Sequence, residues 1–169
     1  MNNWPKQDPA SMNAFYGCPN INHDAEADAD WVRSNVVYIP PPFRLVLAWN
    51  PEKIVTKIAI HRKCADSLTR ILDRIGKEIP CDVAEKCQLH MYGGSFMFRP
   101  MRGIPGSLSI HSWAAAIDLS TIINDLGTKW GDKPNMMPAA VVSIFEAEGW
   151  TWGGRFSRPD CQHFQAATI

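Results

Sequence analysis

The stretch SIHSWAAAIDLS, residues 109–120, places His111 and Asp118 seven positions apart in an otherwise apolar segment. A buried polar group without a partner costs free energy, so the fold must supply a hydrogen bond or a metal ion for each of them. The alternation in AAIDLS predicts a β-strand with Asp118 on the face opposite to its apolar neighbours Ile117 and Leu119. Two interpretations stay open at this point: a buried His–Asp hydrogen bond and a shared metal ion.

Patterns elsewhere in the chain predict a mixed fold of helices and short strands. Apolar residues recur at helical spacing over 62–77, and a proline and a glycine bracket a second predicted helix over 138–148. KIVTKIAI at 53–60 predicts a strand, and WTWGG and CQHFQ predict two closing strands with a turn between them. We therefore expect an α+β domain in which helices pack on a small, mostly antiparallel sheet.

The length of 169 residues fits one domain with a sizeable core. We expect residues 1–169 to form this single domain. Residues 1–42, which are polar and punctuated by prolines, are predicted to be an irregular N-terminal extension, and residues 43–169 the folded core.

Composition argues against several classes of partner. Lys and Arg together number 17, as do Asp and Glu, so the zero net charge favours neither nucleic acid nor an anionic membrane surface. Apolar runs are too short for a transmembrane helix, and the first residues lack the apolar stretch of a secretory signal, so we expect synthesis as a cytoplasmic chain. Five cysteines without a CxxC pair favour reduced thiols over a disulfide framework; a Cys81–Cys87 bridge is the alternative in an oxidising compartment.

Three residues have side chains suited to a catalytic zinc site: His111, Asp118 and His163. Such a site uses three protein ligands and leaves a fourth position for a water molecule, whose pKa falls to about 7 on the metal. Asp160 is a candidate general base if the chain turns between it and His163, and Pro159 favours a turn there.

Other polar and aromatic residues near these candidates have possible supporting roles. Arg99 and Arg102, in FRPMRG, are candidates for stabilising negative charge that develops on a carbonyl under attack. Ser109 is a candidate for a hydrogen bond near the first ligand, and Trp152, beside two glycines, is the best aromatic candidate for a substrate groove.

Two competing constellations are weaker on physical grounds. His23 and Asp30 repeat the seven-residue spacing, but they lie in an acidic, polar segment that cannot preorganise ligands. Cys161 and His163 are two residues apart and suggest a cysteine nucleophile, but no third orienting group accompanies them.

Several motifs, taken together and in order, resemble those of the M15 zinc peptidases. They are SxHxxxxAxD from Ser109 to Asp118, WGG at 152–154 and DxxHFQ at 160–165. This family includes D-alanyl-D-alanine carboxypeptidases and dipeptidases and the L-alanyl-D-glutamate endopeptidases of phage endolysins. The flanking segments YGGSFMFRPMRG and MPAAVVSIFEAEGWTWGG look like the endolysin branch, and the resemblance runs from about residue 53 to 166.

The resemblance implies the fold shared by DD-peptidases and hedgehog proteins, and a role for each candidate residue. By this resemblance His111, Asp118 and His163 bind Zn²⁺, Asp160 is the catalytic acid/base, and Arg99, with Arg102 beside it, polarises the scissile carbonyl or holds a substrate carboxylate. One position departs from the family pattern: a glycine is usual three residues after the first histidine, where this chain has Ala114. If that position needs a positive φ, alanine costs about 1 kcal/mol there.

The function implied is hydrolysis of a peptide bond in the stem peptide of bacterial peptidoglycan, with an L-Ala–D-Glu endopeptidase expected first. A D-Ala–D-Ala carboxypeptidase with the same site is one alternative, and a non-enzymatic zinc protein that binds the cell wall or serves as a structural phage component is another. A chain made in the cytoplasm would need a membrane-permeabilising partner such as a phage holin to reach the wall. A monomer is expected.

Overall fold

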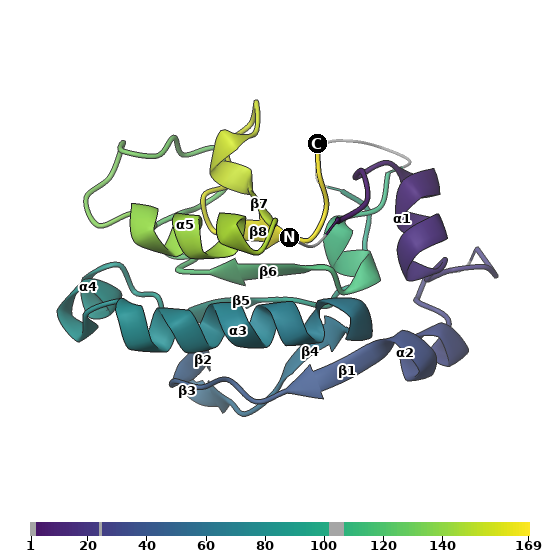
Figure 1. Cartoon of the computed structure of the whole chain (residues 1–169), viewed down its shortest axis with the longest axis horizontal. Coiled ribbons are helices and arrows are strands. Elements are labelled where there is room, and N and C mark those ends of the chain that lie inside the picture. The colour runs from purple at the N-terminus through teal and green to yellow at the C-terminus, as the bar shows by residue number, and fades with distance from the viewer. Residues whose placement is uncertain (1–2, 24, 102–106) are drawn as a thin grey trace.

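A mixed six-stranded sheet forms the centre of the molecule, in a computed structural model that describes residues 3–23, 25–101 and 107–169 (Figure 1). The strand order is β3-β2-β5-β6-β8-β7. The strands are β2 (Leu45–Leu47), β3 (Asn50–Val55), β5 (Met91–Gly94), β6 (Ala116–Leu119), β7 (Thr151–Trp152) and β8 (His163–Gln165). Neighbours are antiparallel except for β2 and β5, which are parallel. The predicted α+β class with a mostly antiparallel sheet is confirmed.

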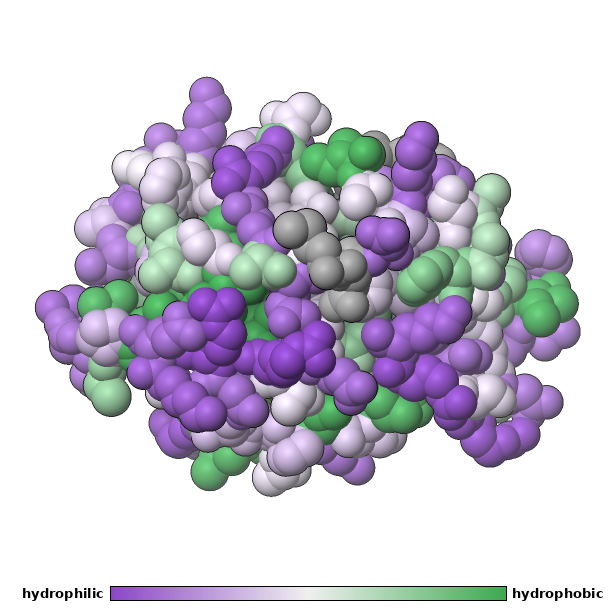
Figure 2. Space-filling view, viewed as in Figure 1, coloured by the Kyte–Doolittle hydropathy of each residue, from purple (hydrophilic) through white to green (hydrophobic). Residues whose placement is uncertain are grey.

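Helices α3 (Arg62–Glu78) and α5 (Ala139–Ala147) lie side by side across one face of this sheet (Figure 1). The apolar stripe predicted for residues 62–77 is the buried side of α3, and its outer side carries Arg70 and Arg74 in ion pairs, on a face that is largely hydrophilic (Figure 2). The helix predicted over 138–148 is α5, although Pro138 is its N-cap and not its first helical residue.

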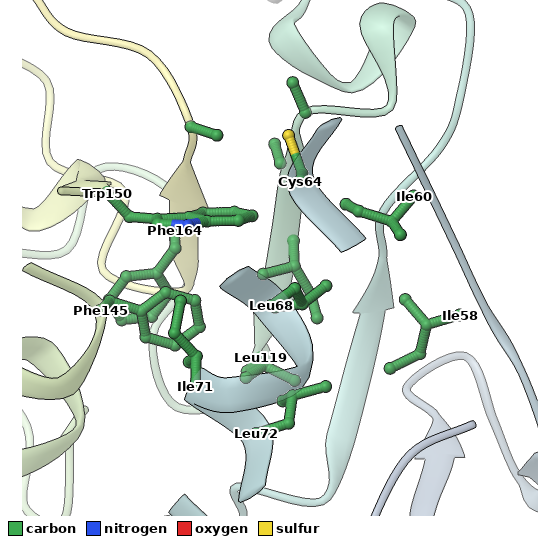
Figure 3. Packing of buried hydrophobic residues seen from close by; sticks show 14 of the residues in the cluster. Ile58, Ile60, Cys64, Leu68, Ile71, Leu72, Leu119, Phe145, Trp150 and Phe164 are labelled. Carbon is green, nitrogen blue, oxygen red and sulfur yellow. The ribbon is translucent and has the colours of Figure 1, made fainter. Parts of the chain in front are cut away.

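Aromatic and aliphatic side chains from both helices and the sheet form one core (Figure 3). Phe145 of α5 stacks on Phe164 of β8, with ring centroids 3.8 Å apart. Leu68 of α3 and Leu119 of β6 are fully buried in the same cluster. This packing fixes β6 and β8, the two strands that carry the candidate ligands, because their apolar side chains are part of the core.

The single strand predicted over 53–60 was wrong. Residues 56 and 57 separate β3 from a second strand, β4 (Ile58–His61), which pairs instead with β1 (Val36–Ile39) in a two-stranded sheet. An unbroken apolar alternation does not reveal where a chain passes from one sheet to another.

The irregular N-terminal extension predicted for residues 1–42 was also wrong. This segment forms α1 (Pro9–Tyr16), α2 (Ala29–Asn35) and β1. The Asp8 side chain caps α1 by accepting a hydrogen bond from the Ser11 N–H, and a proline stands in the first turn of the helix. Tyr16, at the end of α1, is buried and donates its hydroxyl hydrogen to the Ala166 carbonyl at 2.6 Å. Helices of seven or eight residues are too short to give a clear periodic signal, yet these contacts make the segment part of the core.

The five cysteines form no disulfide, and Cys64, Cys87 and Cys161 are buried as expected for thiols in the core, whereas Cys81 is exposed. Cys81 begins the short helix α4 (Cys81–Lys86), and Cys87 follows its last residue.

Within the described ranges, no helix combines the length and apolar character needed to cross a bilayer.

His61 is a buried core histidine, and it makes stability depend on pH. Its Nε2–H donates to the Tyr16 carbonyl at 3.1 Å, and its Nδ1 accepts from the Lys63 N–H at the start of α3. Burial, together with the charges of Lys63 and Arg62, lowers the pKa of His61 from 6.5 to about 4. Protonation would remove the Nδ1 acceptor and place a charge in the core.

We therefore predict a loss of stability in mild acid that depends on His61. The unfolded chain gains a proton on this ring near pH 6.5 but the folded chain only near pH 4, so stability is complete above this window and falls as pH falls through it. The contribution is up to about 3 kcal/mol. Urea denaturation between these pH values should show a shallower pH dependence in His61→Asn, which keeps a capping acceptor. An equal slope in both proteins would contradict the assignment.

Candidate metal centre

Three elements bring the predicted ligands together. His111 lies on η1 (Ile110–Trp113), a 3₁₀ turn that leads into β6, while Asp118 and His163 are directly paired across β6 and β8. Paired residues on neighbouring antiparallel strands have side chains on the same face of the sheet. Among the residues that the structure describes, these three form the one group of three or more possible ligands whose donor atoms converge.

The distances within this group suit a single metal ion. His111 Nε2 lies 3.2 Å from both Asp118 Oδ1 and His163 Nδ1, and the last two atoms are 2.9 Å apart. Tetrahedral zinc with ligands at about 2.0–2.1 Å separates its ligand atoms by about 3.3 Å. The triangle formed by His111 Nε2, Asp118 Oδ1 and His163 Nδ1 is therefore close to the size that such an ion needs.

The hydrogen bonds around the triangle leave its three corners as acceptors. His111 Nδ1–H donates to the Ser95 carbonyl at 3.0 Å, and His163 Nε2–H donates to Gln165 Oε1 at 3.2 Å. In these tautomers the other ring nitrogens present lone pairs toward a carboxylate oxygen, which can only accept. One added proton could bridge a single pair of these atoms, whereas a metal ion satisfies all three. This observation favours a metal site over the buried His–Asp hydrogen bond.

Charge and burial oppose each other at the centre. Burial would raise the pKa of Asp118, but the neighbouring His111 and His163 hold it well below its usual range. Burial would lower the pKa of His163, and Asp118 outweighs this and raises it. The carboxylate is thus ionised over the whole physiological range and available as a ligand.

Asp160 stands beside the triangle on a tight turn. The His163 N–H donates to the Asp160 carbonyl at 3.0 Å, so the chain turns between the two residues as the sequence predicts. Gly153 holds this turn by accepting from the Asp160 N–H at 2.9 Å, and a Cβ at Gly153 would lie 2.5 Å from the Asp160 carbonyl oxygen. The glycine of the WGG motif is therefore required by close backbone approach.

The Asp160 carboxylate has the properties of a group that exchanges protons. Burial is the largest influence on its pKa and raises it, with the negative charge of Asp118 acting in the same direction against His163. Its Oδ1 atom is buried and has no hydrogen-bond partner in the described structure. A buried carboxylate oxygen without a partner next to three metal-type ligands fits a site that accommodates a metal ion and its water.

Comparison with known families agrees with this geometry. Residues 102–166 match the M15 peptidase model described as D-alanyl-D-alanine carboxypeptidase. Over this segment the chain is similar to the M15 peptidases. The match contains all three residues of the triangle and Asp160, so the resemblance inferred from the motifs is confirmed. No curated protein and no solved structure matches the chain.

The structure describes only one of the two candidate arginines, Arg99. The backbone of Arg99 is fixed beside η1: its N–H donates to Ser112 Oγ at 3.1 Å, and its carbonyl accepts from the Ser109 N–H at 3.0 Å. Its guanidinium donates to the carbonyl of the next residue, Pro100. Arg102 lies outside the described residues. The catalytic roles of both arginines stay predictions.

Ser109 and Trp152 are both buried. Ser109 directly precedes η1, and its backbone N–H donates to the Arg99 carbonyl. Trp152 is 5% exposed, and its Nε1–H donates to the Cys161 carbonyl at 2.9 Å, which gives this ring a packing role. A role for either residue in binding substrate stays a prediction.

The competing constellations find no geometric support. His23 and Asp30 are exposed and belong to no ligand cluster among the described residues. Cys161 is buried, and burial raises the pKa of its thiol to about 11, which disfavours the thiolate that a nucleophile needs.

Sequence reasoning missed the residues that orient the ligands. Ser95 accepts from His111 through its carbonyl, which no side-chain motif can reveal. Ser112 Oγ both accepts from the Arg99 N–H and donates to the Arg99 carbonyl. Gln165 could have been found, because residues two apart on a strand share a face and Gln165 follows His163 by two.

Ala114 adopts the left-handed conformation that the family glycine suggests, with φ 51° and ψ 35°. It ends η1, and its N–H donates to the His111 carbonyl at 3.0 Å, so its strain lies where the chain turns from the first ligand into β6. Ala114 and its neighbour Ala115 are both fully buried, but only Ala114 has a positive φ.

These two alanines offer a matched pair of substitutions. Ala115→Gly should destabilise the fold by about 1–2 kcal/mol through the lost methyl and the freer unfolded chain. Ala114→Gly should cost about 1 kcal/mol less, because it also relieves the left-handed strain. Chemical denaturation of both variants measures the difference. Equal losses would mean that Ala114 is not strained.

Loss of one ligand should abolish metal binding. His163→Ala removes a corner of the triangle, so the purified protein should lose the equimolar zinc that we expect in the wild type, as measured by mass spectrometry of metal content. His23→Ala, at the exposed repeat of the motif spacing, should retain the metal. Removal of zinc from the wild type by a chelator should lower its melting temperature, since the metal binds only the folded state. Full zinc content in His163→Ala would refute the ligand assignment.

Proposed function

We propose that this chain is a zinc-dependent peptidoglycan peptidase of the L-Ala–D-Glu endopeptidase type. The observation that carries the proposal is the convergence of three acceptor atoms from His111, Asp118 and His163 within 2.9–3.2 Å, in a segment that matches the M15 peptidases. The Asp118 side chain is 15% exposed to solvent, so water can reach the three ligand atoms.

In this proposal each residue has one task. His111, Asp118 and His163 hold Zn²⁺, which when bound supplies Lewis acidity and lowers the pKa of a water molecule to about 7. Asp160, whose pKa is raised by burial, accepts a proton from the attacking water and returns it to the leaving amine. Arg99 donates hydrogen bonds to the oxygen on which negative charge develops. Arg102 is the second candidate for that task.

A D-Ala–D-Ala carboxypeptidase is the second candidate function, because the matching family model carries that description. Both functions use the same metal, base and arginine and differ in the bond that is placed over them. In a carboxypeptidase, an arginine would also bind the free carboxylate at the end of the stem peptide.

The biological setting that we propose is lysis of a bacterial cell wall. The endolysin-like segments around the site support it, as does the zero net charge, which favours neither nucleic acid nor an anionic membrane as partner. The chain would be made in the cytoplasm and reach the wall after a holin-like protein opens the membrane. We expect it to act there as a monomer.

Digestion of purified peptidoglycan tests the function. An L-Ala–D-Glu endopeptidase should leave L-alanine on the glycan and release stem peptides with a new amino terminus at D-glutamate. A carboxypeptidase should release only free D-alanine, and a non-enzymatic wall-binding protein should bind without new termini. Mass analysis of the soluble products separates these outcomes.

Asp160→Asn is the matched inactive control. It preserves shape but cannot accept the proton, so turnover should fall by about 100-fold or more while the zinc content stays unchanged. Full turnover in this variant would remove Asp160 as the base, and loss of zinc would show that Asp160 supports the ligands instead.

A further inference from the structure

The N-terminal segment, residues 3–23 and 25–35, lies outside residues 102–166, which match the family model. One of its side chains, Gln7, contacts Gln165, which in turn contacts the candidate ligand His163. We propose that Gln7 and Gln165 are a pair of positioning residues that fix the tautomer and the ring orientation of His163. The consequence of this proposal rests on the proposed function, while its geometry rests on hydrogen bonds that the structure shows.

Gln165 makes three contacts from a fully enclosed position. Its side chain belongs to β8, and the residue is 1% exposed. Its Oε1 lies 3.2 Å from His163 Nε2, while its Nε2 donates to Gln7 Oε1 at 3.0 Å and to the Ala167 carbonyl at 3.4 Å. A buried amide with every group satisfied is held in one orientation.

The Ala167 carbonyl decides which way the amide points. A carbonyl oxygen can only accept, so the Gln165 nitrogen must lie on that side and the Gln165 oxygen must face His163. Facing an acceptor, His163 carries its proton on Nε2. Its Nδ1 then presents a lone pair, 2.9 Å from Asp118 Oδ1, at the corner of the triangle.

Gln7 secures the same orientation from the other side. The backbone around it pairs with the C-terminal residues: the Gln7 N–H donates to the Thr168 carbonyl at 2.8 Å, and the Thr168 N–H donates to the Pro5 carbonyl at 2.8 Å. This pairing places Gln7 Oε1 where it accepts the second Gln165 hydrogen. Without Gln7, one N–H of a buried amide has no partner, and the amide can rotate away from His163.

The N-terminal segment also supports the element that carries the other histidine. Trp113 lies two residues after His111 on η1, is fully buried, and donates its Nε1–H to Asn13 Oδ1 of α1 at 3.0 Å. The segment therefore contacts η1 as well as β8. This agrees with a positioning role, but Gln7 is the residue that acts directly on a ligand's partner.

Zinc affinity, measured by competition with a chromogenic chelator, tests the pair. Gln165→Leu should weaken binding by about 10- to 100-fold, as is usual when the hydrogen-bond partner of a ligating histidine is removed. Gln7→Ala, one step further out, should weaken it by up to about tenfold. Gln7→Glu keeps an acceptor for Gln165 and should restore the wild-type affinity. Lys6→Ala, at the neighbouring exposed residue, should leave the affinity unchanged.

The His163 tautomer gives a second readout that needs no metal. In the metal-free protein at a pH where the ring is neutral, ¹⁵N chemical shifts should show the proton on Nε2 in the wild type and in Gln7→Glu. Gln7→Ala should show a mixture of the two tautomers. A residue that only stabilised the fold would change the melting temperature without changing this signature.

The outcomes separate this proposal from the proposed function. Wild-type affinity and an unchanged Nε2–H tautomer in Gln7→Ala would overturn the positioning role even if the protein is an active peptidase. A shifted tautomer in Gln7→Ala would support the pair even if the wild type failed to cleave peptidoglycan. If Gln165→Leu does not fold, Gln7→Ala and Gln7→Glu still decide the matter, because Gln7 is only half-buried.

Discussion

The pairing of Asp118 with His163 across β6 and β8 is the constraint on which the rest of the site depends. These two residues are 45 positions apart in the chain, and the register of the two strands places His163 Nδ1 2.9 Å from Asp118 Oδ1. A slip of one residue would turn one of the two side chains to the opposite face. The stacked rings of Phe145 and Phe164 resist such a slip, because Phe164 alternates with His163 and can fill the core in only one register. The hydrophobic core and the chemical centre are thus two faces of the same pair of strands.

The third ligand is placed by a different kind of structure. His111 comes from a short 3₁₀ turn that ends in a left-handed alanine, and its ring is oriented by a backbone carbonyl at Ser95. Such a turn gives a ligand less freedom than a loop, and it lets the chain reverse into β6 within a few residues. The strain at Ala114 is the energetic cost of that reversal.

Much of the site could be predicted from the sequence, because histidine and aspartate are seldom buried in a core unless they bind a metal ion or a hydrogen-bond partner. His111, Asp118 and His163 are polar residues in apolar segments, and the turn before His163 was predicted from Pro159. The N-terminal helices were missed, since their short amphipathic pattern is weak and their stability comes from contacts with distant residues such as Ala166. The split between β3 and β4 was missed because periodicity records alternation and not the partner of a strand. The Ser95 carbonyl, which accepts from His111, depends on three-dimensional geometry that no linear spacing encodes, whereas the position of Gln165 two residues after His163 could have indicated its contact with that ring.

The pairing of Pro5 and Gln7 with Thr168 affects when the surroundings of His163 can form during synthesis of the chain. These contacts, and the contact of Gln7 with Gln165, join residues about 160 positions apart, so they close only after nearly the whole segment has left the ribosome. A partly synthesised chain can form α1 and α3, but it cannot complete the surroundings of His163. The hydrogen bonds from Gln165 to Gln7 and from Thr168 to Pro5 are therefore among the last contacts to form around His163 while this segment is synthesised.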